Sequence, residues 1–204
     1  MSHTRIRTKR LELVAVTEEL AKAENTDRAA FAQLLGVLTP EKWPPPLNDA
    51  DSMQWAWNHA RKHPGGEGFG MWYVVLPVRD GGSGRGDGVR GVEGDIGESR
   101  VIGTCGFRGM PSDDGTVETG YSILEEHQRQ GYGTELVRAL VEWAFADARV
   151  ARIIGETFPD MTPSRRVLEK CGFTLRGEAA EPGAVRYELT RGEWEAGGRS
   201  RAAG

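Results

Sequence analysis

The chain lacks the features that mark several classes of protein. Only two of its 204 residues are cysteines, Cys105 and Cys171, and neither stands at a spacing typical of metal ligands. We therefore expect two reduced, buried thiols, no disulfide and no metal site. The longest apolar run, 71–78, is far shorter than the ~20 residues that cross a bilayer, and the first residues lack the apolar core of a signal peptide. No membrane association and a cytoplasmic location are the expectations.

The sequence also lacks an excess of positive charge. The 26 Lys and Arg residues stand against 30 Asp and Glu residues, which gives a net charge of −4. Proteins whose main partner is a nucleic acid usually carry a strongly basic surface, so no such partner is expected. A mildly acidic body suits a cationic partner better.

Length and composition predict one elaborated domain over residues 1–204. A chain of this length can bury a full core, and 38% of its residues are hydrophobic. Glycine dominates one stretch, 80–99, which has few apolar residues and is predicted to be a flexible insertion between two strands. The tail, 197–204, is predicted to fray.

The stretch 116–148 organises the rest of the chain. Apolar and polar residues alternate over 116–124, with the period of a strand that has two unlike faces. From residue 134 the apolar positions change to helical spacing; they are Leu136, Val137, Leu140, Val141, Ala144 and Phe145. Because the period changes at Gly131 and Gly133, the stretch predicts a strand, a glycine turn and a helix.

A glycine turn before a helix has a chemical use. The first amides of a helix lack partners and carry partial positive charge, so such a turn can hold phosphate oxygens. The spacing Gln128-x-x-Gly131-x-Gly133 is weak evidence by itself, because most glycine turns bind nothing. No Gly-Lys-Ser/Thr follows, which excludes a Walker-type loop, and the third glycine of the dinucleotide fingerprint is missing.

The same signals predict the remaining elements. Helices are expected at 18–23 after the capping residue Thr17, at 27–35 and at 49–63. Another is expected to run from Thr162 as N-cap, with Pro163 in its first position, to Cys171. The other predicted strands lie near 11–16, 71–77, 100–107, 151–158, 173–175 and 185–189. With 116–124 they make about seven.

Two motifs resemble a known family. The Gln128-x-x-Gly131-x-Gly133 turn between a Glu-x-Gly-Tyr strand and an amphipathic helix resembles the acyl-CoA motif of the GNAT superfamily of N-acetyltransferases. Residues 164–173, Ser-Arg-Arg-Val-Leu-Glu-Lys-Cys-Gly-Phe, resemble its later helix and following strand, especially in the branch similar to ribosomal-protein-alanine acetyltransferases. With the opening 8–13 and the closing 186–189, the resemblance covers nearly the whole chain.

The resemblance implies a fold and an activity. The fold would be α/β (α+β), with a mixed, mostly antiparallel sheet, flanking helices and a V-shaped cleft where the fourth strand and the next splay apart. The activity would be direct transfer of an acetyl group from acetyl-CoA to a primary amine in a ternary complex. A non-catalytic acyl-CoA-binding sensor or scaffold of the same fold is the alternative.

The implied cofactor site consists of a strand edge and the glycine turn. Exposed backbone at the end of the strand would pair with the pantetheine arm, and the amides of the turn would hold the pyrophosphate. The side chains of Gln128 and Arg129 would reinforce the binding of the pyrophosphate. The implied cofactor-binding residues are Ser122, Ile123, Leu124, Gln128, Arg129, Gln130, Gly131, Tyr132, Gly133 and Thr134.

The resemblance implies Glu118 and Ser164 as the catalytic groups. Glu118 stands where some family members carry a glutamate base, and burial would raise its pKa towards usefulness; otherwise it orders water or only pairs with an arginine. Ser164 would contact CoA or return a proton to the sulfur, directly or through water. The chain departs from the family pattern at Leu168, where many relatives have a tyrosine acid, and at Met161, where an asparagine is common.

The acceptor is left open by the motifs. The resemblance favours a protein α-amine, with an aminoglycoside or another small amine as alternatives. Trp43, Trp55 and His59 would line one wall of its site by analogy, although aromatic residues at helical spacing usually belong to a core. A monomer or a homodimer fits equally well.

Overall fold

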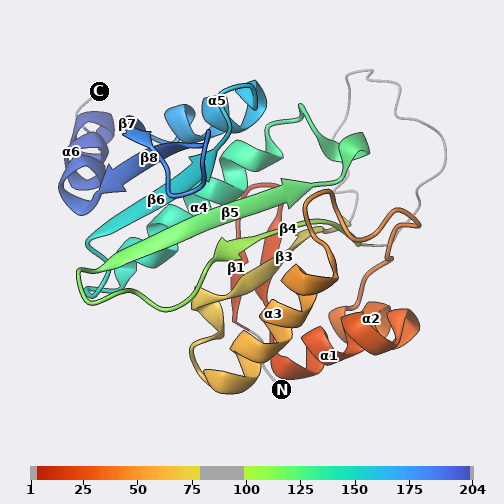
Figure 1. Cartoon of the computed structure of the whole chain (residues 1–204). Coiled ribbons are helices and arrows are strands. Elements are labelled where there is room, and N and C mark those ends of the chain that lie inside the picture. The colour runs from red at the N-terminus through yellow and green to blue at the C-terminus, as the bar shows by residue number, and fades with distance from the viewer. Residues whose placement is uncertain (1–3, 79–98, 203–204) are drawn as a thin grey trace.

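One eight-stranded sheet with helices on both faces organises the computed structural model, which describes residues 4–78 and 99–202 (Figure 1). The strands are β1 Arg5–Arg7, β2 Glu12–Ala15, β3 Met71–Leu76, β4 Arg100–Phe107, β5 Thr116–Ile123, β6 Arg152–Thr157, β7 Thr174–Glu178 and β8 Val185–Thr190. The helices are α1 Glu18–Thr26, α2 Arg28–Leu35, α3 Ala50–Lys62, α4 Tyr132–Ala146, α5 Thr162–Lys170 and α6 Arg191–Ala202, with short 3-10 helices η1 Glu67–Phe69 and η2 Glu125–His127.

The sheet order is β1-β2-β3-β4-β5-β6-β8-β7. Every neighbouring pair is antiparallel except β5 and β6, which run parallel. The predicted mixed, mostly antiparallel sheet is therefore confirmed, with one strand more than expected. The extra strand, β1, is held to β2 by Arg5 and Arg7, which both pair with Glu12. It has only three residues, too few for an alternating pattern to show.

Alternation along β2 explains why both faces are covered. Leu13 belongs to the cluster beneath α4, whereas Val14 belongs to the cluster beneath α1 and α2, and both are fully buried. Helix α4 lays its apolar stripe on the first face, with Leu136 and Leu140 at its centre. A central strand buried on both faces is apolar at successive positions, as β3 is.

Helix starts follow the predicted signal at α1 but differ from it at α5. Thr17 caps α1 by accepting from the Leu20 amide, as expected. Helix α5 begins one residue earlier than predicted, with Met161 rather than Thr162 as its N-cap and no side-chain cap.

The stretch from Gly197, predicted to fray, belongs to helix α6 as far as Ala202. Two contacts fix the start of this helix. Thr190 and Glu193 exchange hydrogen bonds in a capping box, and Trp194 stacks on Phe145 at 5.1 Å. Residues 203–204 lie outside the described part.

The predicted insertion 80–99 lies outside the described residues apart from Ser99, whose carbonyl accepts from the Leu38 amide. Over the described ranges, no helix has both the length and the apolar character that crossing a bilayer requires.

Candidate active site

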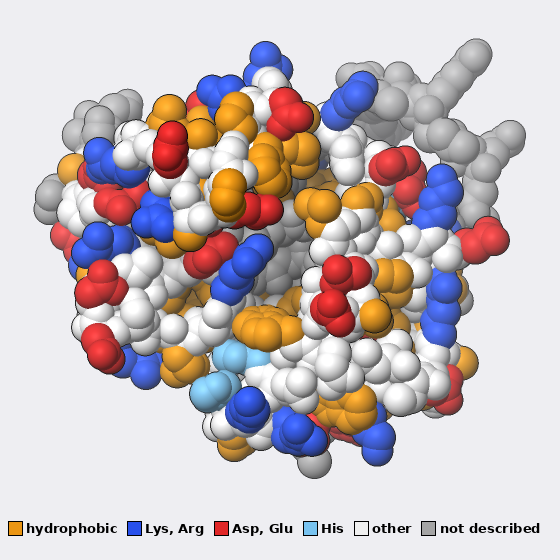
Figure 2. Space-filling view, viewed as in Figure 1, with side chains coloured by type: hydrophobic (Ala, Val, Ile, Leu, Met, Phe, Trp, Pro, Cys, Tyr) orange, Lys and Arg blue, Asp and Glu red, His pale blue; other side chains and the backbone are white. Residues whose placement is uncertain are grey.

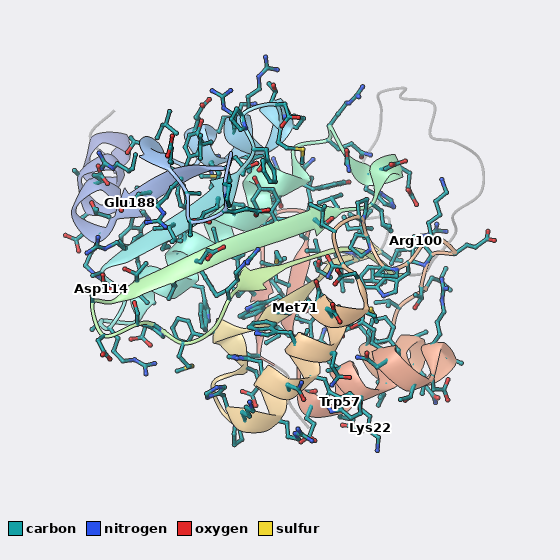
Figure 3. The ribbon with its side chains drawn as sticks, in the orientation of Figure 1. Lys22, Trp57, Met71, Arg100, Asp114 and Glu188 are labelled. Carbon is teal, nitrogen blue, oxygen red and sulfur yellow. The ribbon has the colours of Figure 1, made fainter. Side chains whose placement is uncertain are left out.

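Strand β5 pairs with both β4 and β6, but its pairing with β6 ends halfway along the strand. Its first residues pair with β6 from Thr116↔Arg152 to Glu118↔Ile154, and no later pair is formed. Its later residues, from Thr119 to Ile123, pair with β4 only. In Figure 3 the label of Asp114 lies just before the start of β5, at the end of the strand where β5 and β6 are paired. The predicted splayed cleft is therefore present.

The ladder to β4 decides which backbone groups face the split. The amides of Arg108 and Leu124 bond to Glu118 O and Ile102 O, so the even-numbered residues of β5 turn their N–H and C=O groups towards β4. By this alternation the groups of Ser122 and Leu124 are not at the open edge. Those of Tyr121 and Ile123 are, and of the predicted trio only Ile123 faces the split.

The glycine turn has the backbone geometry of an anion cradle. Gly131 is the N-cap of α4 with a φ of 82°, and Arg129 is also left-handed with a φ of 60°. Within the described chain, no amide from Arg129 to Thr134 donates to a protein acceptor. Successive free N–H groups at a helix start converge on an anion.

Side chains brace this turn. Gln128 Nε2 donates to Ile123 O at 2.9 Å, and Gln130 Nε2 donates to Glu126 O at 3.1 Å. Gln128, predicted to reinforce a pyrophosphate grip, therefore ties the turn to the end of β5 instead. Arg129 is exposed, and its guanidinium contacts no acceptor within the described chain.

An ion pair with the first turn of α4 holds the cradle from behind. Arg10 Nε contacts Glu135 Oε2 at 2.7 Å, and Arg10 Nη1 donates to Gln130 O at 2.7 Å. The same guanidinium lies 4.5 Å from the centre of the Tyr132 ring. Sequence reasoning gave Arg10 no role, because its partners are more than a hundred residues away and nothing local points to them.

A groove of about 410 Å³ adjoins the turn between α4 and the segment 6–10. Its charged lining residues are Arg7, Lys9, Arg10, Glu135, Arg138 and Glu142. Basic side chains outnumber acidic ones there, so the groove suits an anionic group better than a cationic one.

Glu118 lies at the split on the opposite face of β5 from Tyr121. Its Oε1 is 2.9 Å from Arg108 Nε, and its side chain is 26% exposed. Burial raises the pKa of Glu118 above its ordinary value and so does the charge of Glu156, while Arg108 and Arg186 oppose the shift. The pKa of Glu118 is therefore raised, as predicted. The side chain also pairs with an arginine, which was the predicted alternative to a role as base.

Ser164 meets a hydroxyl that the sequence did not single out. Tyr121 Oη donates to Ser164 O at 3.1 Å and lies 3.2 Å from Ser164 Oγ. Burial raises the pKa of Tyr121 to about 12, so the phenol keeps its proton. Leu168, one turn further along α5, is buried in the core and packs near Gly155. The two hydroxyls thus meet between β5 and α5. One turn along α5, the apolar side chain of Leu168 offers no proton.

The wall formed by α3 contains only part of the expected set. Trp43 is buried away from the cleft, donating to Glu24 at 2.9 Å and packing with Phe31 and Tyr73, so its expected lining role is wrong. Trp55 remains exposed and stacks on buried His59 at 5.1 Å.

One glycine makes room on the same side of the sheet. Gly120 pairs with Gly106 across β4 and β5, and a Cβ added to Gly120 would meet no atom within 4 Å, whereas a Cβ on Gly106 would clash with Gly70 O. Figure 2 shows this face hollowed near its centre, with acidic, basic, hydrophobic and histidine side chains around the hollow.

Comparison with known proteins points to one family. The model of the acetyltransferase (GNAT) domain matches residues 10–174. The uncharacterized N-acetyltransferase YjdG of Bacillus subtilis is 27% identical over 176 residues, which are 86% of this chain and 93% of the relative.

Solved structures share the architecture. RimL, a ribosomal L7/L12 alpha-N-protein acetyltransferase in complex with coenzyme A, gives a TM-score of 0.60 at 18% identity, over 92% of this chain and 98% of that chain. An acetyltransferase from Agrobacterium tumefaciens gives 0.56 at 22% identity, over 94% and 96%. At these identities the likeness shows the fold alone.

Proposed function

This chain belongs to the GNAT family of acetyltransferases, and we propose that it moves the acetyl group of acetyl-CoA to a primary amine by direct attack in a ternary complex. The observation that carries the proposal is the position of the free-amide turn directly after the open edge of β5. A cofactor with a diphosphate and an amide-rich arm needs both features side by side.

The cofactor would be held mainly by backbone. The amides from Arg129 to Thr134 would bind the diphosphate of the cofactor. The basic groove behind Gly131 would suit a further anionic group of the same molecule. The outward N–H and C=O groups of Tyr121 and the N–H group of Ile123 would pair with the pantetheine arm as another strand would, since Ile123 O already accepts from Gln128 Nε2. An amide of this edge would face the thioester oxygen and stabilise the charge that develops there.

Glu118 would accept the proton of the amine. An amine with a pKa of roughly 10 is almost fully protonated near neutrality, so a base must act before it can attack. The amine nitrogen then bonds to the acetyl carbon while the carbon–sulfur bond breaks. Ser164, with Tyr121 beside it, would return a proton to the sulfur. No cysteine is placed for a covalent relay, because Cys105 and Cys171 are both buried.

The acceptor class needs a direct experiment. RimL is described as acting on a ribosomal protein α-amine, so a peptide α-amine and small amines are the candidates here. Purified protein with acetyl-CoA and a panel of such amines should release free CoA in proportion to acetylated amine. Binding of acetyl-CoA without release for any amine would instead favour a sensor or scaffold.

A further inference from the structure

Four charged side chains form a row across four strands at the split. Arg108 follows Phe107↔Thr119 in the β4–β5 register, so it stands opposite Glu118. Across the split, Glu156 lies two residues beyond Ile154, the last partner of Glu118, and therefore on the same face. Arg186 pairs with Glu156 in the β6–β8 register. The order of charges across the sheet is plus, minus, minus, plus.

The split passes between the two carboxylates. Glu118 is the last residue of β5 paired with β6, and Glu156 lies beyond the last pair on β6. The two carboxylates carry like charges, and the charge of Glu156 is one of the causes that raise the pKa of Glu118. A cation that enters between them relieves the repulsion of these like charges.

The two arginines at the ends of the row differ in how many of their nitrogens contact a carboxylate. Arg186 uses both Nε and Nη2 on Glu156 Oε1, at 3.0 and 2.9 Å. Arg108 uses only Nε on Glu118, its side chain is 75% exposed, and its two terminal nitrogens have no partner among the residues of known placement. A free guanidinium fork matches the geometry of a carboxylate.

From this row we infer that the acceptor is a zwitterion of the α-amino acid type, with its ammonium between Glu118 and Glu156 and its carboxylate on the terminal nitrogens of Arg108. The inference rests on the proposed function and names its substrate class. Cross-strand neighbours such as Arg108 and Glu118 have Cβ atoms about 5 Å apart. An ammonium and a carboxylate on one carbon atom are close enough together to meet both.

Charge balance during the reaction favours the same acceptor. At rest, the two arginines and the two carboxylates sum to zero. When Glu118 takes a proton from the ammonium, Arg108 loses its negative partner and the row gains a positive charge. A carboxylate on the acceptor restores the balance, and the freed amine forms the nitrogen–carbon bond as the carbon–sulfur bond breaks. An amine without a carboxylate forms no such contact, and Arg108, which is mostly exposed, is then solvated by water alone.

A matched pair of acceptors tests this inference. Leucine and leucinamide differ only in the carboxylate, and kcat/KM is measured for both with wild-type protein and with Arg108→Met. The ratio of leucine to leucinamide should fall about 10-fold or more in the variant, the size expected for a lost charge-assisted hydrogen bond. The differing amine pKa values of the two acceptors cancel when the two ratios are compared.

Two further variants control for charge and folding. Arg152→Met removes an arginine from the same face of β6 at the closed end of the β5–β6 pair, where Arg152 lies near Asp114 and Glu188, and should keep the wild-type ratio. Arg108→Lys should recover part of the ratio because it keeps the charge. An unchanged ratio in Arg108→Met, with both acceptors turned over, overturns the zwitterion and leaves the proposed function standing. No acetylation of any amine overturns both.

Discussion

In the proposed mechanism, backbone groups make the cofactor side of the cleft, whereas charged side chains make its acceptor side. The turn 129–134 and the edge of β5 offer amides whose positions are set by a helix start and a strand ladder. The acceptor side offers Arg108, Glu118, Glu156 and Arg186, whose ends can exchange partners. The first side suits an invariant cosubstrate, and the second can be changed residue by residue to suit another amine.

The difference also concerns rigidity. Gln128, Arg10 and Glu135 fix the turn from three directions, so little freedom is lost when an anion binds. Arg108 is mostly exposed and is held by one contact, so it can move to a new partner at small cost. Substitutions on the two sides should therefore change different constants, CoA affinity on one and turnover on the other.

The largest effect is expected from Glu118→Gln on the acceptor side. The amide cannot take the amine proton, so kcat/KM should fall about 1000-fold near neutral pH, within the usual range for a general base. Between the raised pKa of Glu118 and an amine pKa near 10, the loss should grow as pH falls, because less of the amine is free. Initial rates from pH 6 to 9.5 measure it.

Two controls belong to that substitution. The affinity for CoA should stay at the wild-type value, since Glu118 lies on the far face of β5 from the turn. Glu188→Gln changes another carboxylate of the same sheet, close to Arg152 and Arg176 (Figure 3), and should keep the wild-type pH profile. Equal losses at pH 6 and 9.5 would remove Glu118 from the role of base.

The next effect is expected from Gly131→Val on the cofactor side. A β-branched residue at a φ of 82° is strained, and its side chain would crowd Arg10 Nη2, which lies 3.3 Å from the position of a Cβ. Relaxing that strain turns the amides away, so the Kd for CoA should rise about 100-fold. Isothermal calorimetry measures it.

Gly183→Val is the matched control. Gly183 has almost the same φ, 84°, in the turn before β8, and no atom lies within 4 Å of its Cβ position. Its substitution should lower thermal stability as Gly131→Val does but leave the Kd for CoA unchanged. Equal losses of affinity in both variants would mean that global destabilisation, not the cradle, is responsible.

Tyr121→Phe acts where the two sides meet. Removing the hydroxyl takes away the group beside Ser164, so kcat should fall about 10-fold, the size of one hydrogen bond that strengthens in the transition state. The Kd for CoA should change much less, because the ring keeps its packing. Single-turnover rates with saturating acetyl-CoA separate the two. A change confined to the Kd would assign Tyr121 to binding alone.

The smallest effect is expected from Arg10→Met. Losing the contacts with Glu135 and Gln130 O loosens the turn without removing an amide. The Kd for CoA should rise about 5-fold, equivalent to about 1 kcal/mol of lost preorganisation. Calorimetry with Arg5→Met as control, an arginine that pairs with Glu12 outside the turn, measures it. An equal effect in both variants would contradict a specific brace.

Much of the cofactor side could be predicted from the sequence. The period change at Gly131 and Gly133 is local, and local signals fix a strand, a turn and a helix start. The GNAT resemblance and the fold class that it implied are both confirmed. Local signals could not show which residues of β5 turn their backbone groups towards β4. That alternation places Tyr121 and Ile123, not Ser122 and Leu124, at the open edge.

The acceptor side was largely hidden for a physical reason. Glu118 could be named because it lies in the organising strand, but its neighbours Arg108, Glu156 and Arg186 reach it only through strand register. Register between β5, β6 and β8 is fixed by packing of the whole sheet, and no spacing along the chain encodes it. The same applies to Tyr121 and Ser164, which are 43 residues apart.

Amide signals of glycines test the central claim most directly. In protein labelled with ¹⁵N-glycine and titrated with CoA, the signals of Gly131 and Gly133 should move furthest, while those of Gly177 and Gly183 on the β7–β8 side stay in place. Saturating CoA that leaves Gly131 and Gly133 unmoved would contradict a diphosphate held by the amides of 129–134.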